Sequence, residues 1–396
     1  MALDIHKERG TPLDMQGFAL HELCGPPHSK LDDDVFSRLR ILRMLATEHG
    51  AARTSHHLAT QDRALQGTLA RLRRFEAEQA AFLTSLLPAD LSAIETSIAV
   101  EQLEIETGAA IAHAEPNAYL AQSQRFAMTE DVDHLYRLAA LHDRLEGRDA
   151  GVLTQYQTDI VPGRPTRLHH RAPHDDLRDA YDTETVALRT RLHARTARDV
   201  HALARTLHTS AGLRQSDPVA RMLLTELALV EESHLTQVAC TIDTSENLVV
   251  RWMLSELGEV WHYWGCARHE TNARLRAAWE RMLQWELAHL HIAMDVYRQR
   301  ERRDPAEFIP SILPEPLDDH GHRAFVRATL TTERDHCAVG TRITTRDEEA
   351  DDGPTALVRA RLGREGFASE SIATGWHWRP GTELLDHGNI STTPRT

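Results

Sequence analysis

The sequence predicts an all-α protein made of two tandem four-helix bundles, and three observations lead to this fold class. Apolar residues recur at three- and four-residue spacing through eight long segments. Pro, Gly, Asn and Asp residues interrupt that spacing between the segments. The two halves of the chain also match each other at one constant shift. The expected helices cover residues 32–58, 62–87, 91–113 and 117–146 in the first half and 183–209, 216–241, 246–269 and 272–302 in the second.

Helix boundaries and seams follow from individual residues. The second helix has apolar or amide residues at the a and d positions, with Glu76 and Gln79 between Leu72 and Leu83. Pro88 and the following Asp90 predict a stop and a new start. We expect an N-terminal arm, a first bundle, a linker, a second bundle and a wrapping tail at residues 1–31, 32–147, 148–182, 183–303 and 304–396. The Pro-rich linker and tail are expected to be irregular, apart from one short helix near residues 322–332, and short turns favour a short connection between the second and third helices.

Composition excludes several classes of function. The 396 residues carry a formal net charge of -14, which argues against a nucleic-acid partner. No apolar run approaches the roughly 18 residues of a membrane span, so no membrane partner is expected. The first residues, MALDIHKERG, contain no apolar signal core, and a cytoplasmic location is the expectation. The 25 histidines beside so many acids direct attention to metals.

A shift of 155 residues superimposes polar as well as apolar positions. Glu115, Asn117, Ala118 and Leu120 fall on Glu270, Asn272, Ala273 and Leu275. Glu76, Glu101, Glu104, Asp131 and His134 fall on Glu231, Glu256, Glu259, Glu286 and His289. Amphipathic helices in general share leucine spacing, but that spacing does not explain the matched acids. We interpret the match as a tandem duplication of a four-helix unit.

Two Glu-x-x-His motifs, Glu231/His234 and Glu286/His289, occupy core positions of predicted helices. Residues three apart share a helix face, so both side chains of a motif can reach one ion. Uncompensated buried carboxylates are costly, which predicts a positive charge between them. The alternative is pairing with Arg221, Arg251 or Arg281, although these arginines are expected at the surface. A further Glu-x-x-His, Glu333/His336, lies in the tail and is interpreted as an accident of composition.

The stretches EESH (231–234), SELGE (255–259) and WELAH (285–289) resemble the ferritin-like, rubrerythrin-type dinuclear carboxylate proteins. That resemblance implies two iron or manganese ions that react with O2 or peroxide. It implies that Glu231 and Glu286 bridge or chelate the ions and that His234 and His289 each cap one ion. Glu256, with or without Glu259, would be the third-helix ligand and Asp199 the first-helix ligand. The sequence departs from the family in this aspartate and in the short connection between the second and third helices.

The first half offers a second candidate site with Glu48, Glu76, Glu101, Glu104, Asp131 and His134. Gln79 stands where His234 stands in the second half, so a degenerate first site is expected. Tyr263, one turn beyond Glu259, is a candidate electron or hydrogen-bond donor; the alternative is a core tyrosine.

The leading function is a non-haem di-iron or di-manganese oxidoreductase in the second bundle. Its expected partners are O2 or peroxide, an electron donor and a small-molecule substrate, in a chain that could form a homo-oligomer. The alternatives are metal storage without turnover and a structural helical assembly module.

Overall fold

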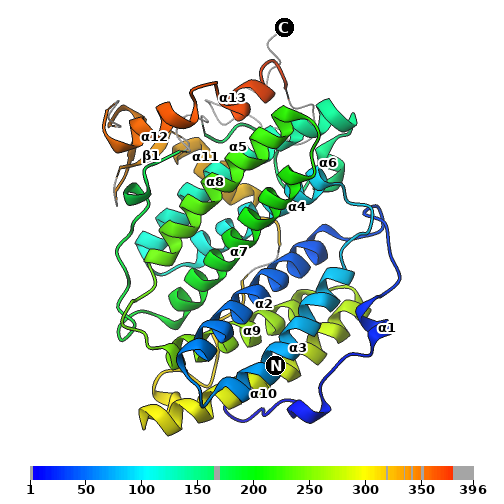
Figure 1. The fold of residues 1–396 in the computed structure, drawn as a ribbon, viewed down its shortest axis with the longest axis vertical. Coiled ribbons are helices and arrows are strands. Elements are labelled where there is room, and N and C mark those ends of the chain that lie inside the picture. The colour runs from blue at the N-terminus through cyan, green and yellow to red at the C-terminus, as the bar shows by residue number, and fades with distance from the viewer. Residues whose placement is uncertain are drawn as a thin grey trace. The chain divides into compact units, whose positions relative to one another are not determined.

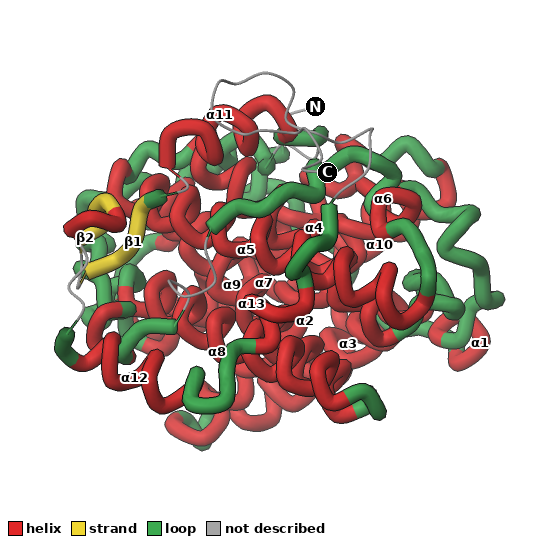
Figure 2. Tube along the Cα trace, turned by 90° about the horizontal axis from the view of Figure 1, so that it is seen from above, coloured by secondary structure: helices red, strands yellow, loops and turns green. Residues whose placement is uncertain are grey.

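The protein is mostly helical, as the computed structural model shows for residues 3–164, 170–317, 320–333, 335–339, 342–348 and 352–377. Helices α1 to α13, several three-residue 3-10 helices and one two-stranded hairpin make up the regular structure within these ranges (Figures 1 and 2). The all-α prediction is therefore confirmed. None of the helices in the described ranges combines the length and the apolar composition that crossing a lipid bilayer requires.

Eight long helices lie within a few residues of the expected positions. They are α2 (Val35–Gln61), α3 (Gln66–Ser85), α4 (Ala93–Ala114), α5 (Ala118–Glu146), α7 (Leu188–Leu213), α8 (Pro218–Cys240), α9 (Leu248–His269) and α10 (Ala273–Glu301). Side-chain caps explain several starts. Ser92 accepts a hydrogen bond from the Glu95 amide and Asp217 accepts one from the Ala220 amide. Gly147, with a φ of 62°, ends α5 in the left-handed conformation that glycine adopts without strain.

The 155-residue repeat reappears in these boundaries. Helices α9 and α10 begin and end 155 residues after α4 and α5. Asn117 and Asn272 cap α5 and α10 in the same way, each accepting hydrogen bonds from the second and third amides of its helix. Glu115 and Glu270 each accept a hydrogen bond from the backbone amide of that asparagine. The matched residues therefore build matched local structure.

The chain forms two compact units, and their boundaries differ from the expected tandem bundles. Unit 1 comprises Met1–Ala89, Tyr181–Asp199 and Asp243–Asp319, and unit 2 comprises Asp90–Ala180, Val200–Ile242 and His320–Thr396. Unit 1 contains the hairpins α2–α3 and α9–α10, with α2 packed against α9 (Figure 1). Unit 2 contains the hairpin α4–α5 with α8 and the second part of α7, and α5 packs against α8.

The predicted domains 32–147 and 183–303 are thus wrong, because each unit takes helices from both halves. The predicted short connection between second and third helices is present at residues 86–92 and 241–247, but each of these turns leads from one unit to the other. Residues 147–199 lie between α5 and the part of α7 that belongs to unit 2, and residues 86–247 lie between the hairpins α2–α3 and α9–α10 of unit 1. Short turns do predict antiparallel neighbours, but the turn between α3 and α4 leads from one unit to the other.

The linker and the tail contain more regular structure than expected. The linker contains α6 (Ala150–Leu153), and the predicted tail helix is α11 (Arg323–Glu333). The tail also contains a hairpin of β1 (His336–Val339) and β2 (Arg342–Thr345), with Cys337 paired to Thr344, followed by α12 (Pro354–Leu362) and α13 (Ala368–Ile372). The arm contains the short α1 (Leu20–Leu23). The part of the predicted tail after residue 377 lies outside the described residues.

The core of each unit surrounds a layer of buried polar side chains. Trp252, Tyr263 and Trp279 are fully buried in unit 1. Ile105, Val132 and Leu224 belong to the apolar core of unit 2. Since large apolar side chains pack around each polar layer, the polar groups are kept from bulk water.

Candidate metal centres

The predicted acids and histidines collect in two separate clusters. The unit 1 cluster contains Glu48, Glu76, Glu256, Glu259, Glu286 and His289, and the unit 2 cluster contains Glu101, Glu104, Asp131, His134, Glu231 and His234 together with His201 and His208. Every one of these side chains is at most 3% exposed. The expectation that Glu231 and Glu286 share one centre is wrong, since α8 and α10 belong to different units.

In unit 2, carboxylates and imidazoles from four helices converge. The Nδ1 atom of His201 lies 2.8 Å from Glu104 Oε1 and 2.9 Å from Glu231 Oε2. The Nδ1 atom of His134 lies 3.3 Å from Glu231 Oε1 and 3.5 Å from Glu101 Oε1. The Nδ1 atom of His234 lies 3.4 Å from Glu231 Oε2. Glu231 on α8 is therefore the shared residue of the cluster.

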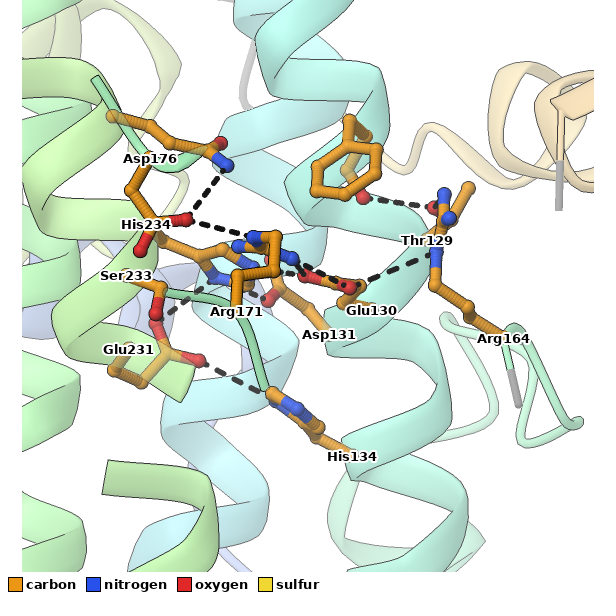
Figure 3. A network of polar contacts seen from close by, with 12 residues as sticks. Thr129, Glu130, Asp131, His134, Arg164, Arg171, Asp176, Glu231, Ser233 and His234 are labelled. Carbon is orange, nitrogen blue, oxygen red and sulfur yellow. Dashed lines mark hydrogen bonds and ion pairs between the residues drawn. The ribbon is translucent and has the colours of Figure 1, made fainter. Parts of the chain in front are cut away.

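A second layer of charged side chains holds His234 from behind (Figure 3). Its Nε2 atom lies 2.7 Å from Glu130 Oε2, so the ring presents Nδ1 to the cluster. Arg171 Nη1 donates to both Glu130 oxygens at 3.0 Å, and Arg171 Nε donates to Asp176 Oδ1 at 2.7 Å. Arg164 approaches Glu130 Oε1 at 3.8 Å. This layer fixes the orientation of the imidazole.

In the unit 2 cluster, each charged side chain shifts the pKa values of its neighbours. Burial and the charge of Glu231 raise the pKa values of Glu104 and Asp131 well above the ordinary range. Burial opposes charge on Glu231 too, but His234 and the other two imidazoles lower its pKa well below the usual value. Against the effect of burial, Glu231 and Glu130 raise the pKa of His234 to about 10. Without a metal, protons held by Glu104, Asp131 and His234 offset the negative charge of this cluster.

The unit 1 cluster has more carboxylates and fewer imidazoles. Gln79 Nε2 donates to Glu286 Oε1 at 2.7 Å, and His289 Nδ1 lies 3.0 Å from Glu286 Oε2. Trp252 Nε1 donates to Glu256 Oε1 at 2.5 Å. The Tyr263 hydroxyl donates a short hydrogen bond to Glu48.

Burial dominates the electrostatics of unit 1. Burial and the neighbouring carboxylates raise the pKa values of Glu48, Glu256 and Glu259 well above the ordinary range. Burial also raises the pKa of Glu76 to about 7. Against burial, Glu286 raises the pKa of His289 to about 9. Five carboxylates with one imidazole leave an excess of negative charge that protons or cations must offset.

The N-terminal arm reaches the back of His289. Gln16 Oε1 lies 2.9 Å from His289 Nε2, and Gln16 Nε2 donates to the Thr11 carbonyl at 2.7 Å. The Thr11 amide donates to the Gln284 carbonyl on α10 at 2.7 Å. The arm thus fixes the His289 ring with Nδ1 toward the cluster.

Asp199, the predicted first-helix ligand, does not join a cluster. Its carboxylate pairs with Arg53 at 3.2 Å and with Arg198 at 3.0 Å. His201, two residues later, takes the place in the core that we assigned to Asp199. Glu333, the tail acid, pairs with Arg125 at 3.0 Å and accepts from Gln122 at 2.9 Å.

The arginines of the salt-bridge alternative bond elsewhere. Arg221 donates to the Gln215 carbonyl and Arg251 to the Thr244 carbonyl. Arg281 pairs with Glu22 at 2.9 Å. The three arginines therefore bond to groups outside the clusters.

Sequence reasoning missed His201, His208, Glu130 and Gln16. His201 and His208 on α7 are seven residues apart, which is a heptad spacing that places both on one face. That spacing indicates, from the sequence alone, that both histidines lie on the buried face of the helix. By contrast, Glu130 and Gln16 act through contacts with residues 104 and 273 positions away, which no local pattern reveals.

The donor sets fit divalent metal ions. Neither oxygen of Glu259 and neither ring nitrogen of His208 makes a hydrogen bond to any residue in the described ranges. Yet His208 Nε2 lies 2.9 Å from Glu101 Oε1, close to the separation of about 3 Å expected between adjacent ligands at bond lengths near 2.1 Å. Carboxylates with imidazoles from helices of a bundle form the donor set of dinuclear iron and manganese proteins.

The comparisons with known proteins find no relative. No protein-family model matches the chain, and neither a curated protein nor a solved structure matches it.

Proposed function

We propose that the protein is a ferritin-like, non-haem dinuclear carboxylate oxidoreductase that activates O2 or peroxide, with one metal centre in each unit. The observation that carries the proposal is the convergence of carboxylates and imidazoles in the core of each unit. In the core of unit 1, the two carboxylate oxygens of Glu259 make no hydrogen bond to any described residue. Such groups are costly to bury without a cation.

Chain connectivity supports the family resemblance. In ferritin-like bundles a long crossover joins the two helical hairpins. In unit 2 the hairpin α4–α5 is followed by residues 147–199 before the second part of α7 and α8. The repeated boundaries of α4–α5 and α9–α10 support a duplication whose copies have exchanged hairpins between the units.

Each cluster offers ligands of the expected kind. In unit 2, Asp131, Glu231 and Glu104 would hold the ions through their carboxylates, and His134 and His234 would hold them through their imidazoles. In unit 1 the corresponding set is Glu286, Glu76, His289 and Glu259, with Glu48 and Glu256 beside them. When bound, two adjacent iron or manganese ions supply the electrons and open positions at which O2 or peroxide is reduced.

The surrounding residues position carboxylates and exclude water. Tyr263 and Trp252 each donate a hydrogen bond to a carboxylate of the unit 1 cluster, which places an oxidisable ring beside the centre. Burial and Glu48 raise the pKa of Tyr263 well above its usual value, so the phenol keeps its proton for Glu48. Buried Trp279 and Met282 fill neighbouring space, which disfavours a mineral store.

Aerobic iron titration with elemental analysis and stopped-flow absorbance tests the proposal. We expect about two ions in each unit, one O2 reaction for each loading and return to the ferrous state with a reductant. Tyr263→Phe should retain the ions and slow the re-reduction, with Tyr119→Phe in unit 2 as its matched control. Uptake of tens of ferric ions would favour storage, and absence of metal binding would leave the structural alternative.

A further inference from the structure

The two clusters differ in the atoms they offer to a metal. The unit 2 cluster combines four imidazoles, from His134, His201, His208 and His234, with four carboxylates. The unit 1 cluster combines one imidazole, from His289, with five carboxylates among the described residues. Nitrogen donors are therefore concentrated in unit 2 and oxygen donors in unit 1.

Gln79 is one source of this difference. It lies 155 residues before His234, and Glu76 lies 155 before Glu231, so the two pairs occupy matched positions. The Gln79 side chain turns its NH2 group to Glu286 Oε1 at 2.7 Å. An NH2 group supplies a hydrogen bond and not a lone pair, whereas His234 turns Nδ1 to Glu231.

The groups behind the two histidines also differ in charge. His234 is backed by the carboxylate of Glu130 at 2.7 Å, and His289 by the neutral amide of Gln16 at 2.9 Å. A carboxylate behind an imidazole increases its basicity as a ligand, and a neutral amide does so less. Both differences strengthen nitrogen donation in unit 2 relative to unit 1.

We propose that the two centres select different metals: unit 2 takes an imidazole-preferring ion such as Zn²⁺, Co²⁺ or Fe²⁺, and unit 1 takes the oxygen-preferring Mn²⁺. Imidazole suits iron, cobalt and zinc, whereas carboxylate oxygen suits manganese. Raw affinity rises from Mn²⁺ to Zn²⁺ at almost any site, so the selectivity appears in the ratio of the two affinities. This inference rests on the proposed function, because it requires that both clusters bind metal.

Competition between Mn²⁺ and Zn²⁺ on the full chain tests the inference. The metal-free protein is saturated with Mn²⁺ and titrated with Zn²⁺, and the Mn²⁺ electron paramagnetic resonance signal reports the ions released. We expect two phases, with the unit 2 ions leaving at a Zn²⁺ to Mn²⁺ ratio at least about tenfold lower than the unit 1 ions. One phase with a single ratio would overturn the proposal while leaving the proposed function in place.

Isosteric variants assign the phases. Asp131→Asn should remove the phase at low Zn²⁺, and Glu286→Gln should remove the phase at high Zn²⁺. Gln79→His should shift the unit 1 phase toward the unit 2 ratio, while Gln66→His, at an exposed position of the same helix, should not. The reverse assignment, or an equal shift from both histidine variants, would contradict the proposal. Absence of Mn²⁺ and Zn²⁺ binding in the wild-type chain would refute the proposed function as well.

Discussion

Substitution Glu76→Gln should stabilise the metal-free protein above pH 7. Burial raises the pKa of Glu76 from 4.5 to about 7. Between these values the folded protein holds the proton more tightly than the unfolded chain, so the free energy of unfolding falls as pH rises. The loss of folding free energy caused by Glu76 reaches its full size above the pKa of about 7 that this residue has in the folded protein. A glutamine has almost the same shape but carries no such penalty.

The expected magnitude follows from the two pKa values. At 1.36 kcal/mol for each pKa unit, the change from 4.5 to about 7 corresponds to about 3 kcal/mol at pH 8 and less than about 1 kcal/mol at pH 5. Urea unfolding of the metal-free chain, followed by tryptophan fluorescence, measures it. Trp252, Trp261, Trp264, Trp279 and Trp285 all lie in unit 1, so this signal mainly reports that unit. Glu280→Gln, at an exposed position of α10, is the matched control.

Bound metal should make the wild-type chain more stable than the Glu76→Gln variant, the reverse of the order expected without metal. With saturating Mn²⁺ the wild-type chain gains stability from an ion that Glu76 helps to hold, and the glutamine variant gains less. A Glu76→Gln protein that is less stable than wild type at pH 8 without metal would refute the burial argument. So would a wild-type chain whose metal-free stability does not fall between pH 5 and pH 8, because His289 also loses stabilisation as pH rises from 6.5 to about 9.

Four further substitutions test separate contacts. Glu286→Gln and Asp131→Asn should each lower the metal content by about half, as measured by elemental analysis, and complete loss from either one would show that the units are not independent. Glu130→Gln should weaken unit 2 metal affinity by about 10- to 100-fold through His234, as titration with Co²⁺ would show, whereas Glu232→Gln at the surface should have no effect. Gly10→Ala should displace the arm and weaken unit 1 Mn²⁺ binding, because Gly10 has a φ of +68° and a Cβ there would lie 2.2 Å from the Gln284 carbonyl oxygen.

Helix positions could be predicted from the sequence because their causes are local. Asn117 and Asn272 each accept hydrogen bonds from the first turn of their own helix, so the capping residue marks the start. The burial of Glu231 and Glu286 also follows from their places in apolar seams. Asp199 shows the limit of this reasoning. Its carboxylate pairs with Arg53, a residue 146 positions earlier, and leaves the core position to His201.

The pairing of hairpins could not be predicted, since it depends on contacts between distant segments. The buried face of α8 contains Glu231 and His234 whichever hairpin packs against it. The sequence of α8 is therefore compatible with packing against α4–α5 and with packing against α9–α10. The shift of 155 residues makes those two hairpins equivalent in pattern. The sequence therefore fits two assemblies of these hairpins, with similar seams, and does not distinguish them.

The packing of α2–α3 with α9–α10 gives Gln79 a different role from the one that the sequence predicts. Read along the chain, Gln79 marks a degenerate first half beside an intact second half. In the folded protein it donates to Glu286, which belongs to the second half. Each cluster thus takes side chains from both halves: Gln79, which stands at the position without a histidine, lies in unit 1, while Glu231 and His234 lie in unit 2. The asymmetry that the sequence predicts between halves thus becomes an asymmetry between clusters: the unit 1 cluster is rich in carboxylate oxygens and the unit 2 cluster is rich in imidazole nitrogens.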